Sequence, residues 1–111
     1  MTADLPTRVV PRLKTSLTFH LPDGWRGEVV DLSATGLRIR CVAVLEKNLE
    51  FEGTLVLQDG KEIPLPVRVV WIRLPDHAGY LPGEVGFELL NVPTDYHSEL
   101  ARLFAESQGE Q

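Results

Sequence analysis

The sequence predicts an all-β protein, a six-stranded antiparallel β-barrel with one C-terminal α-helix. Apolar and polar residues alternate in several short segments, as they do in strands with one buried face. Pro, Gly and Asp separate these segments, and only the last segment has helical spacing. Closure into a barrel would remove the sheet edges that otherwise promote aggregation.

The first half of the chain predicts three strands, at 17–21, 25–32 and 37–41. The third strand directs its apolar residues to one face and Arg38 and Arg40 to the other, because strand side chains alternate. Arg38 is interpreted as local electrostatic support.

The second half predicts three further strands, at 51–57, 61–74 and 84–90. Asp59-Gly60 indicates a hairpin turn between the first two. Pro64 and Pro66 lack the N–H that a central ladder needs, so the start of their strand is expected at an edge or a bulge. Residues 75–83 are expected to form a loop.

The only helical pattern follows residue 93, where one apolar stripe recurs at i, i+4, i+7 and i+8. The stripe consists of Tyr96, Leu100, Leu103 and Phe104. The chain is therefore divided into a flexible N-terminal arm (1–13), a barrel with its helix (14–106) and a disordered tail (107–111).

Composition points to one soluble domain of 111 residues, with 43% hydrophobic and 24% charged residues. No apolar run is long enough to span a bilayer, and the N-terminus lacks the pattern of a secretory signal. Cys41 is the single cysteine, which excludes an internal disulfide and favours the cytoplasm. We therefore expect no membrane insertion.

The net charge of −5 is unevenly distributed. Residues 1–40 hold six bases and four acids, whereas residues 41–111 hold five bases and twelve acids. An acidic protein is poorly suited to a nucleic acid polymer, whose binding requires many neutralised phosphates. A positive first third suits a small anionic ligand instead.

The sequence shows no pattern typical of catalysis or metal binding. His20, His77 and His97 lie far apart, and none is at ligand spacing from another His or from Cys41. Ser33 has neither a nucleophile motif nor a nearby candidate base. The chain is therefore expected to be a non-enzyme without a metal or cofactor.

Two short motifs remain, an RxxxR formed by Arg8 and Arg12 and a DxSxxG formed by Asp31, Ser33 and Gly36. Their order, about twenty residues apart, resembles the signature of the PilZ domain family of bacterial receptors for cyclic di-GMP. The resemblance extends to the strand order, the segments 69–71 and 85–87, and the closing helix. It implies that these five residues bind the nucleotide.

The chemistry of the motif residues agrees with this resemblance. An arginine fork matches phosphate oxygens or a purine edge, and the carboxylate of Asp31 can accept hydrogen bonds from guanine. Ser33 offers a short polar contact, and Gly36 allows close backbone approach or a positive φ. Asp31 and Ser33 equally fit a structural role in a turn between strands.

Two further residues are candidate ligand contacts. Arg40 shares its strand face with Arg38 and would reach a phosphate or base. Trp71 would stack its indole on a guanine, although it shares parity with Val67 and Val69 and so also fits the core.

The sequence thus predicts a second-messenger receptor that binds cyclic di-GMP, reorders its N-terminal arm and alters a surface for an unidentified effector protein in motility or biofilm signalling. One alternative is a nucleotide-independent PilZ-like module for protein interaction, for example in pilus or motility regulation. Another is a barrel that binds single-stranded nucleic acid, which the 7% aromatic content disfavours. Effector, ligand stoichiometry, affinity and oligomeric state stay open.

Overall fold

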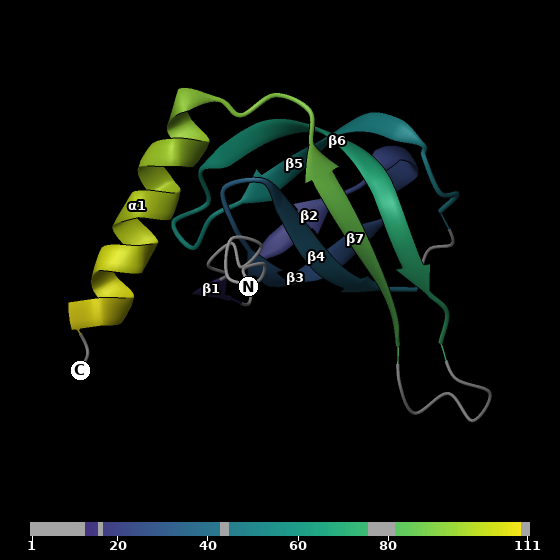
Figure 1. Ribbon diagram of the computed structural model, residues 1–111, viewed down its shortest axis with the longest axis horizontal. Coiled ribbons are helices and arrows are strands. Elements are labelled where there is room, and N and C mark those ends of the chain that lie inside the picture. The colour runs from purple at the N-terminus through teal and green to yellow at the C-terminus, as the bar shows by residue number, and fades with distance from the viewer. Residues whose placement is uncertain (1–12, 16, 43–44, 76–81, 110–111) are drawn as a thin grey trace, which may run out of the picture.

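The computed structural model describes residues 13–15, 17–42, 45–75 and 82–109 (Figure 1). A 3₁₀ turn at Pro22–Gly24 separates the second and third strands. The strands of the described residues are β1 (Leu13–Lys14), β2 (Thr18–His20), β3 (Arg26–Leu32), β4 (Gly36–Cys41), β5 (Glu50–Val56), β6 (Glu62–Arg73) and β7 (Gly83–Leu89), and the helix is α1 (Thr94–Gly109).

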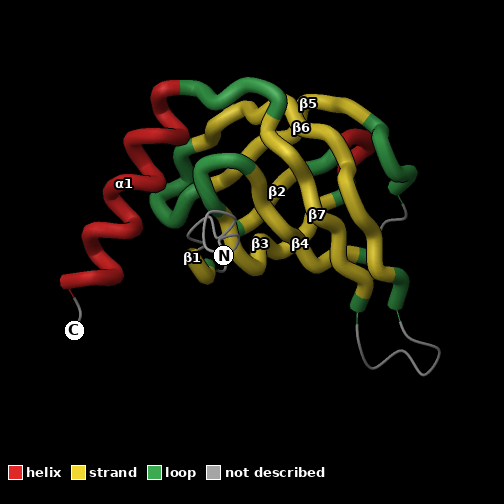
Figure 2. The backbone as a smooth tube through the Cα atoms, in the orientation of Figure 1, coloured by secondary structure: helices red, strands yellow, loops and turns green. Residues whose placement is uncertain are grey.

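The strands close into an antiparallel barrel in the order β3-β2-β5-β6-β7-β4, with β4 pairing back to β3 (Figure 2). β1 and β2 both pair with β3, through Lys14↔Asp31 and Thr18↔Glu28, so they form successive pieces of one side of the ring. The ring therefore has six positions, and the predicted six-stranded barrel with a C-terminal helix is confirmed.

The barrel interior is filled by the alternating apolar residues that the sequence predicted, because these side chains point inward from strands β2 to β7. Phe19 and Phe87 are both part of this core, with ring centroids 5.5 Å apart. On β4 the inward residues are Leu37, Ile39 and Cys41, all buried, while the arginines between them face outward.

Pro64 and Pro66 lie in the half of β6 that pairs with β5 but extends past the end of β7. The carbonyl of Pro66 accepts a hydrogen bond from the Leu90 amide, on the β7 side. Because the N and carbonyl of one strand residue point to the same side, the missing N–H of Pro66 also falls there, where no ladder needs it. The expectation of an edge-like start is confirmed.

Helix α1 lies beside one end of the barrel (Figure 1). Tyr96 and Leu100 anchor it, being 1% and 7% exposed, and Leu103 and Phe104 are half-buried against the core. The helix continues to Gly109, three residues beyond the boundary expected at 106. The anchoring face is the one that the apolar stripe predicted.

Candidate functional site

A β-bulge in β3 turns Asp31 toward the outside of the barrel. The register shifts between Val29, which is fully buried, and Asp31. Without the extra residue Val30, Asp31 would share the inward face of Val29, because alternate residues point the same way. The bulge instead places Asp31 opposite Arg38 on β4.

A second bulge acts in the same way on β6. The register shifts between Val69, which pairs with Phe87, and Trp71, which pairs with Gly86. The extra residue Val70 breaks the parity by which Trp71 would have entered the core, and its side chain is 41% exposed. Trp71 therefore lies on the outer face of the barrel and not in the core.

The two bulges align one row of residues across four strands, Asp31 (β3), Arg38 (β4), Gly86 (β7) and Trp71 (β6). The indole lies directly on the β7 backbone, since a Cβ at Gly86 would be 2.1 Å from Nε1 of Trp71. A glycine within a strand is typical of such close approach. Gly86 is the sequence signal that could have located this contact.

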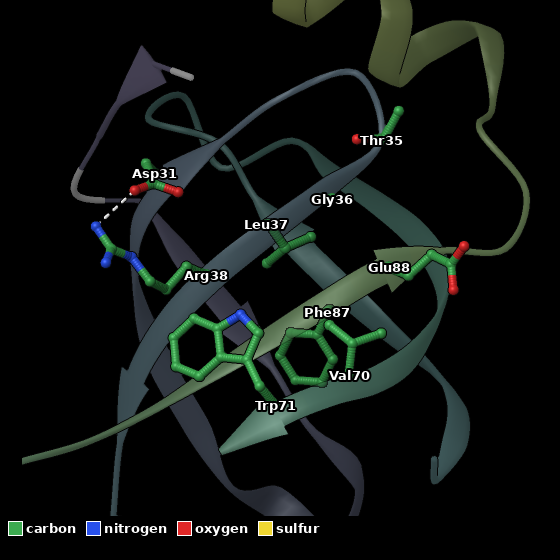
Figure 3. Close-up of a pocket in the computed structure, with 10 residues that line it drawn as sticks. Asp31, Thr35, Gly36, Leu37, Arg38, Val70, Trp71, Phe87 and Glu88 are labelled. Atoms are coloured by element: carbon green, nitrogen blue, oxygen red, sulfur yellow. Dashed lines mark hydrogen bonds and ion pairs between the residues drawn. The ribbon is translucent and has the colours of Figure 1, made fainter. Parts of the chain in front are cut away.

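The row borders a surface cavity of about 510 Å³ (Figure 3). Its wall carries the carboxylate of Asp31, the guanidinium of Arg38 and the indole of Trp71. The lining of the cavity thus combines charged groups with an aromatic ring. Its lining is completed by Thr35, Gly36, Leu37, Val70, Gly86, Phe87 and Glu88.

Asp31 is 4% exposed, and its Oδ2 accepts a hydrogen bond of 2.7 Å from Nη2 of Arg38 (Figure 3). A buried carboxylate is costly unless it is paired and hydrogen-bonded. Arg38, interpreted from sequence as electrostatic support, therefore belongs to the cavity wall. The sequence predicted which face of β4 Arg38 occupies, whereas its contact with Asp31 depends on the bulge in β3.

Ser33 is completely buried in the turn between β3 and β4. Its hydroxyl donates to the carbonyl of Gly36 (3.3 Å) and accepts from the amide of Thr35 (3.3 Å). Its carbonyl accepts a 2.7 Å bond from the hydroxyl of Tyr96 on α1. The structure thus places Ser33 away from the cavity surface and fits the turn role that the sequence left open.

Gly36 lines the cavity, and a Cβ at this position would lie 2.3 Å from the carbonyl oxygen of Phe87. The close approach that requires glycine is therefore to the neighbouring strand β7. Gly36 is not among the glycines of positive φ, which are Gly24 and Gly60 in the described residues. Of the two possibilities that the sequence left for Gly36, close backbone approach or a positive φ, the positive φ does not occur.

Arg40 lies one row further along the same face and does not line this cavity. It is 3.3 Å from Glu28 on β3 and 3.9 Å from Glu84 on β7. Arg73 on β6 also approaches Glu84, at 3.4 Å. Charges therefore alternate in sign across four strands, and Arg40 is engaged in this ladder.

Arg8 and Arg12 lie outside the described residues. The described chain begins at Leu13, whose Cα pairs with that of Leu32, while Lys14 pairs with Asp31. The segment that follows the RxxxR motif therefore runs alongside the first residue of the DxSxxG motif.

Within the described ranges, no group of three or more His, Cys, Asp and Glu residues is arranged to hold a metal ion. Over the same part of the chain, no helix is both long and apolar enough to cross a membrane.

Solved structures with the same fold include YcgR from Escherichia coli in complex with c-di-GMP, with 18% identity and a TM-score of 0.68. The match covers 91% of this chain and 46% of that one, so the chain spans about half the length of that YcgR structure. The isolated PilZ domain of YcgR with c-di-GMP matches at 17% identity and TM-score 0.67, covering 91% of this chain and 94% of that one.

The MrkH-c-di-GMP complex of K. pneumonia has 13% identity and a TM-score of 0.75, covering 92% of this chain and 54% of that one. No curated protein matches the sequence. The family model described as PilZ domain matches residues 7–106, which is nearly the whole sequence and includes both motifs. The chain therefore belongs to the PilZ domain family.

Proposed function

We propose that this protein is a receptor for cyclic di-GMP. The observation that carries the proposal is the cavity that the Asp31 carboxylate and the Trp71 indole both line, next to the point where the chain that bears Arg8 and Arg12 joins the barrel. Structures of the same fold that are described with c-di-GMP support this choice of ligand.

The proposed contacts follow from the chemistry of the ligand, which carries two phosphates and two guanines. Asp31 accepts hydrogen bonds from the N–H groups of one guanine, and the exposed face of Trp71 stacks on a base, a contact worth about 1–3 kcal/mol. Arg8 and Arg12 bind phosphate or base with their planar forks. Ser33 acts through the shape of the turn, because its hydroxyl is buried there.

Signalling would proceed through the N-terminal segment. Because Lys14 pairs with Asp31, a ligand held by Asp31, Arg8 and Arg12 would draw the preceding residues onto the barrel next to β3. This ordering would change the surface presented to an effector protein.

Calorimetric titration with cyclic di-GMP tests the proposal. Arg8→Ala and Arg12→Ala should each weaken binding by about thirtyfold or more, since loss of a charged contact typically costs about 2–5 kcal/mol. Arg102→Ala is the matched control, because Arg102 pairs with Glu99 and Glu106 on the helix and its removal changes the net charge equally.

Titration curves of both arm variants that match the wild type would refute the proposed contacts. If the wild type itself gives no heat at micromolar protein, the nucleotide-independent interaction module becomes the better description. A salt-sensitive shift with oligonucleotides would instead favour single-stranded nucleic acid as the ligand.

A further inference from the structure

Asp31 and Arg38 form an ion pair within the cavity wall. The two residues are direct partners across β3 and β4, and Nη2 of Arg38 is 2.7 Å from Oδ2 of Asp31. The carboxylate is 4% exposed, whereas the arginine side chain is 34% exposed and borders the cavity (Figure 3). Arg38 thus lies between a buried acceptor and the open space.

Arg38 is held from its other side as well. Its Nη1 is 3.6 Å from Oε1 of Glu84, a carboxylate on β7 that is 14% exposed and also 3.4 Å from Arg73. The guanidinium therefore bridges carboxylates from two different strands. Its Nε is buried and has no hydrogen-bond partner among the described residues, so the guanidinium is held through its two terminal nitrogens, Nη1 and Nη2.

The orientation of a carboxylate decides what it can recognise. The terminal torsion of an aspartate is broad, so the side chain itself does not fix the plane of its two oxygens. A carboxylate can accept about four hydrogen bonds, and one that already holds an arginine keeps capacity for further donors in defined directions. Guanine offers two adjacent donors, N1–H and the exocyclic amine, which require such a defined direction.

We propose that Arg38 is a positioning residue that determines base selectivity, by fixing the Asp31 carboxylate so that it accepts from both N1–H and the exocyclic amine of a guanine. This inference rests on the proposed function of the same site. It differs from a general electrostatic role, because a lost positive charge would weaken every dianionic ligand alike.

The test compares cyclic di-GMP with cyclic di-IMP, a ligand of equal charge whose bases lack the exocyclic amine. The ratio of the two dissociation constants therefore reports the contacts of the exocyclic amines of both guanines, and its change in an Asp31 variant gives the part that this carboxylate contributes. The wild type should prefer cyclic di-GMP by about tenfold or more, the effect expected of a hydrogen bond to a charged acceptor. Asp31→Ala serves as the reference for complete loss of this preference.

Arg38→Met should reduce the preference for cyclic di-GMP over cyclic di-IMP to about threefold or less, although Arg38 is not itself the acceptor. Arg38→Lys keeps the charge without the planar fork and should also lower the ratio, so it carries the test if the methionine variant fails to fold. Arg102→Met is the matched control, with its charge removed on the helix, and should leave the ratio unchanged.

A ratio that stays at the wild-type value in Arg38→Met and Arg38→Lys, with both ligands weakened equally, would overturn the inference and leave nucleotide binding intact. Equal binding of the two ligands by the wild type would also overturn it, since the amine would then not be read. Failure of the wild type to bind either ligand would refute the proposed function and the inference together.

Discussion

Replacement of Gly86 by alanine should displace Trp71 from the surface of β7. The added Cβ would lie 2.1, 2.3 and 2.7 Å from Nε1, Cε2 and Cδ1 of the indole, so the ring cannot keep its place. The ring is 41% exposed and is therefore free to lift toward the cavity. We expect the fold to survive and the aromatic wall of the cavity to be lost.

The magnitude follows from the covered surface of Trp71. A tryptophan buries roughly 150–250 Å² when fully enclosed, and somewhat more than half of this side chain is covered. Loss of about half of that contact, at about 25 cal/mol per Å², costs roughly 1–2 kcal/mol. In a domain of this size the corresponding fall in Tm is about 4–8 °C.

The assay is thermal and urea unfolding of four proteins: the wild type, Gly86→Ala, Trp71→Ala and the double variant. In the Trp71→Ala background the steric conflict is absent, so Gly86→Ala should be neutral or slightly stabilising there, because alanine is favoured over glycine within a strand. The fluorescence of Trp71 is measured in a Trp25→Phe background, which removes the other tryptophan of the chain. In this background Gly86→Ala should shift the emission maximum to longer wavelength, because the indole becomes more exposed to water.

A destabilisation by Gly86→Ala that is equal in both backgrounds would refute the steric reasoning. Cyclic di-GMP titration of the same variants adds a functional measure. If the base stacks on the indole as proposed, Gly86→Ala should weaken binding by about fivefold or more.

Three further changes test other contacts. Gly36→Ala should destabilise the fold by at least about 2 kcal/mol, because the added Cβ meets the Phe87 carbonyl oxygen, which is backbone and cannot yield; a Tm within about 2 °C of the wild type would contradict this. Tyr96→Phe should cost about 1 kcal/mol in urea unfolding, since the buried carbonyl of Ser33 loses its 2.7 Å donor, and an unchanged midpoint would count against that bond. Glu84→Gln should destabilise the protein at low ionic strength, because it removes the carboxylate shared by three arginines. The difference in stability from the wild type should shrink in 0.5 M NaCl, roughly where the Debye length falls below about 5 Å. A loss of stability that does not depend on salt would indicate a packing effect instead.

Much of the barrel could be predicted from sequence because its signals are local. Alternation of apolar residues fixes which face of a strand is buried wherever the strand is regular, as in β4. Asp59-Gly60 encodes its turn through the positive φ of Gly60, and the apolar stripe of α1 identifies Tyr96 and Leu100 as its anchors.

The two motifs were sufficient to predict the family, but not the role of each motif residue. The family assignment needs only their order and spacing, which a sequence carries. The role of Ser33 was left between ligand contact and turn, and its burial beneath Tyr96 depends on a helix more than sixty residues later in the chain. The roles of Arg8 and Arg12 stay predictions, since both residues lie outside the described part of the structure.

The sequence alone determined the barrel, its core and the family of the chain, whereas only the tertiary structure decided which side chains meet at the cavity. Val30 and Val70 look like ordinary strand residues, yet each is the extra residue of a bulge that reverses the facing of its neighbour, Asp31 or Trp71. A bulge depends on the register between strands, and for β6 and β7 the partner lies more than ten residues away. That pairing sets the row from Asp31 through Arg38 to Trp71, because alternation within one strand carries no information about its partner.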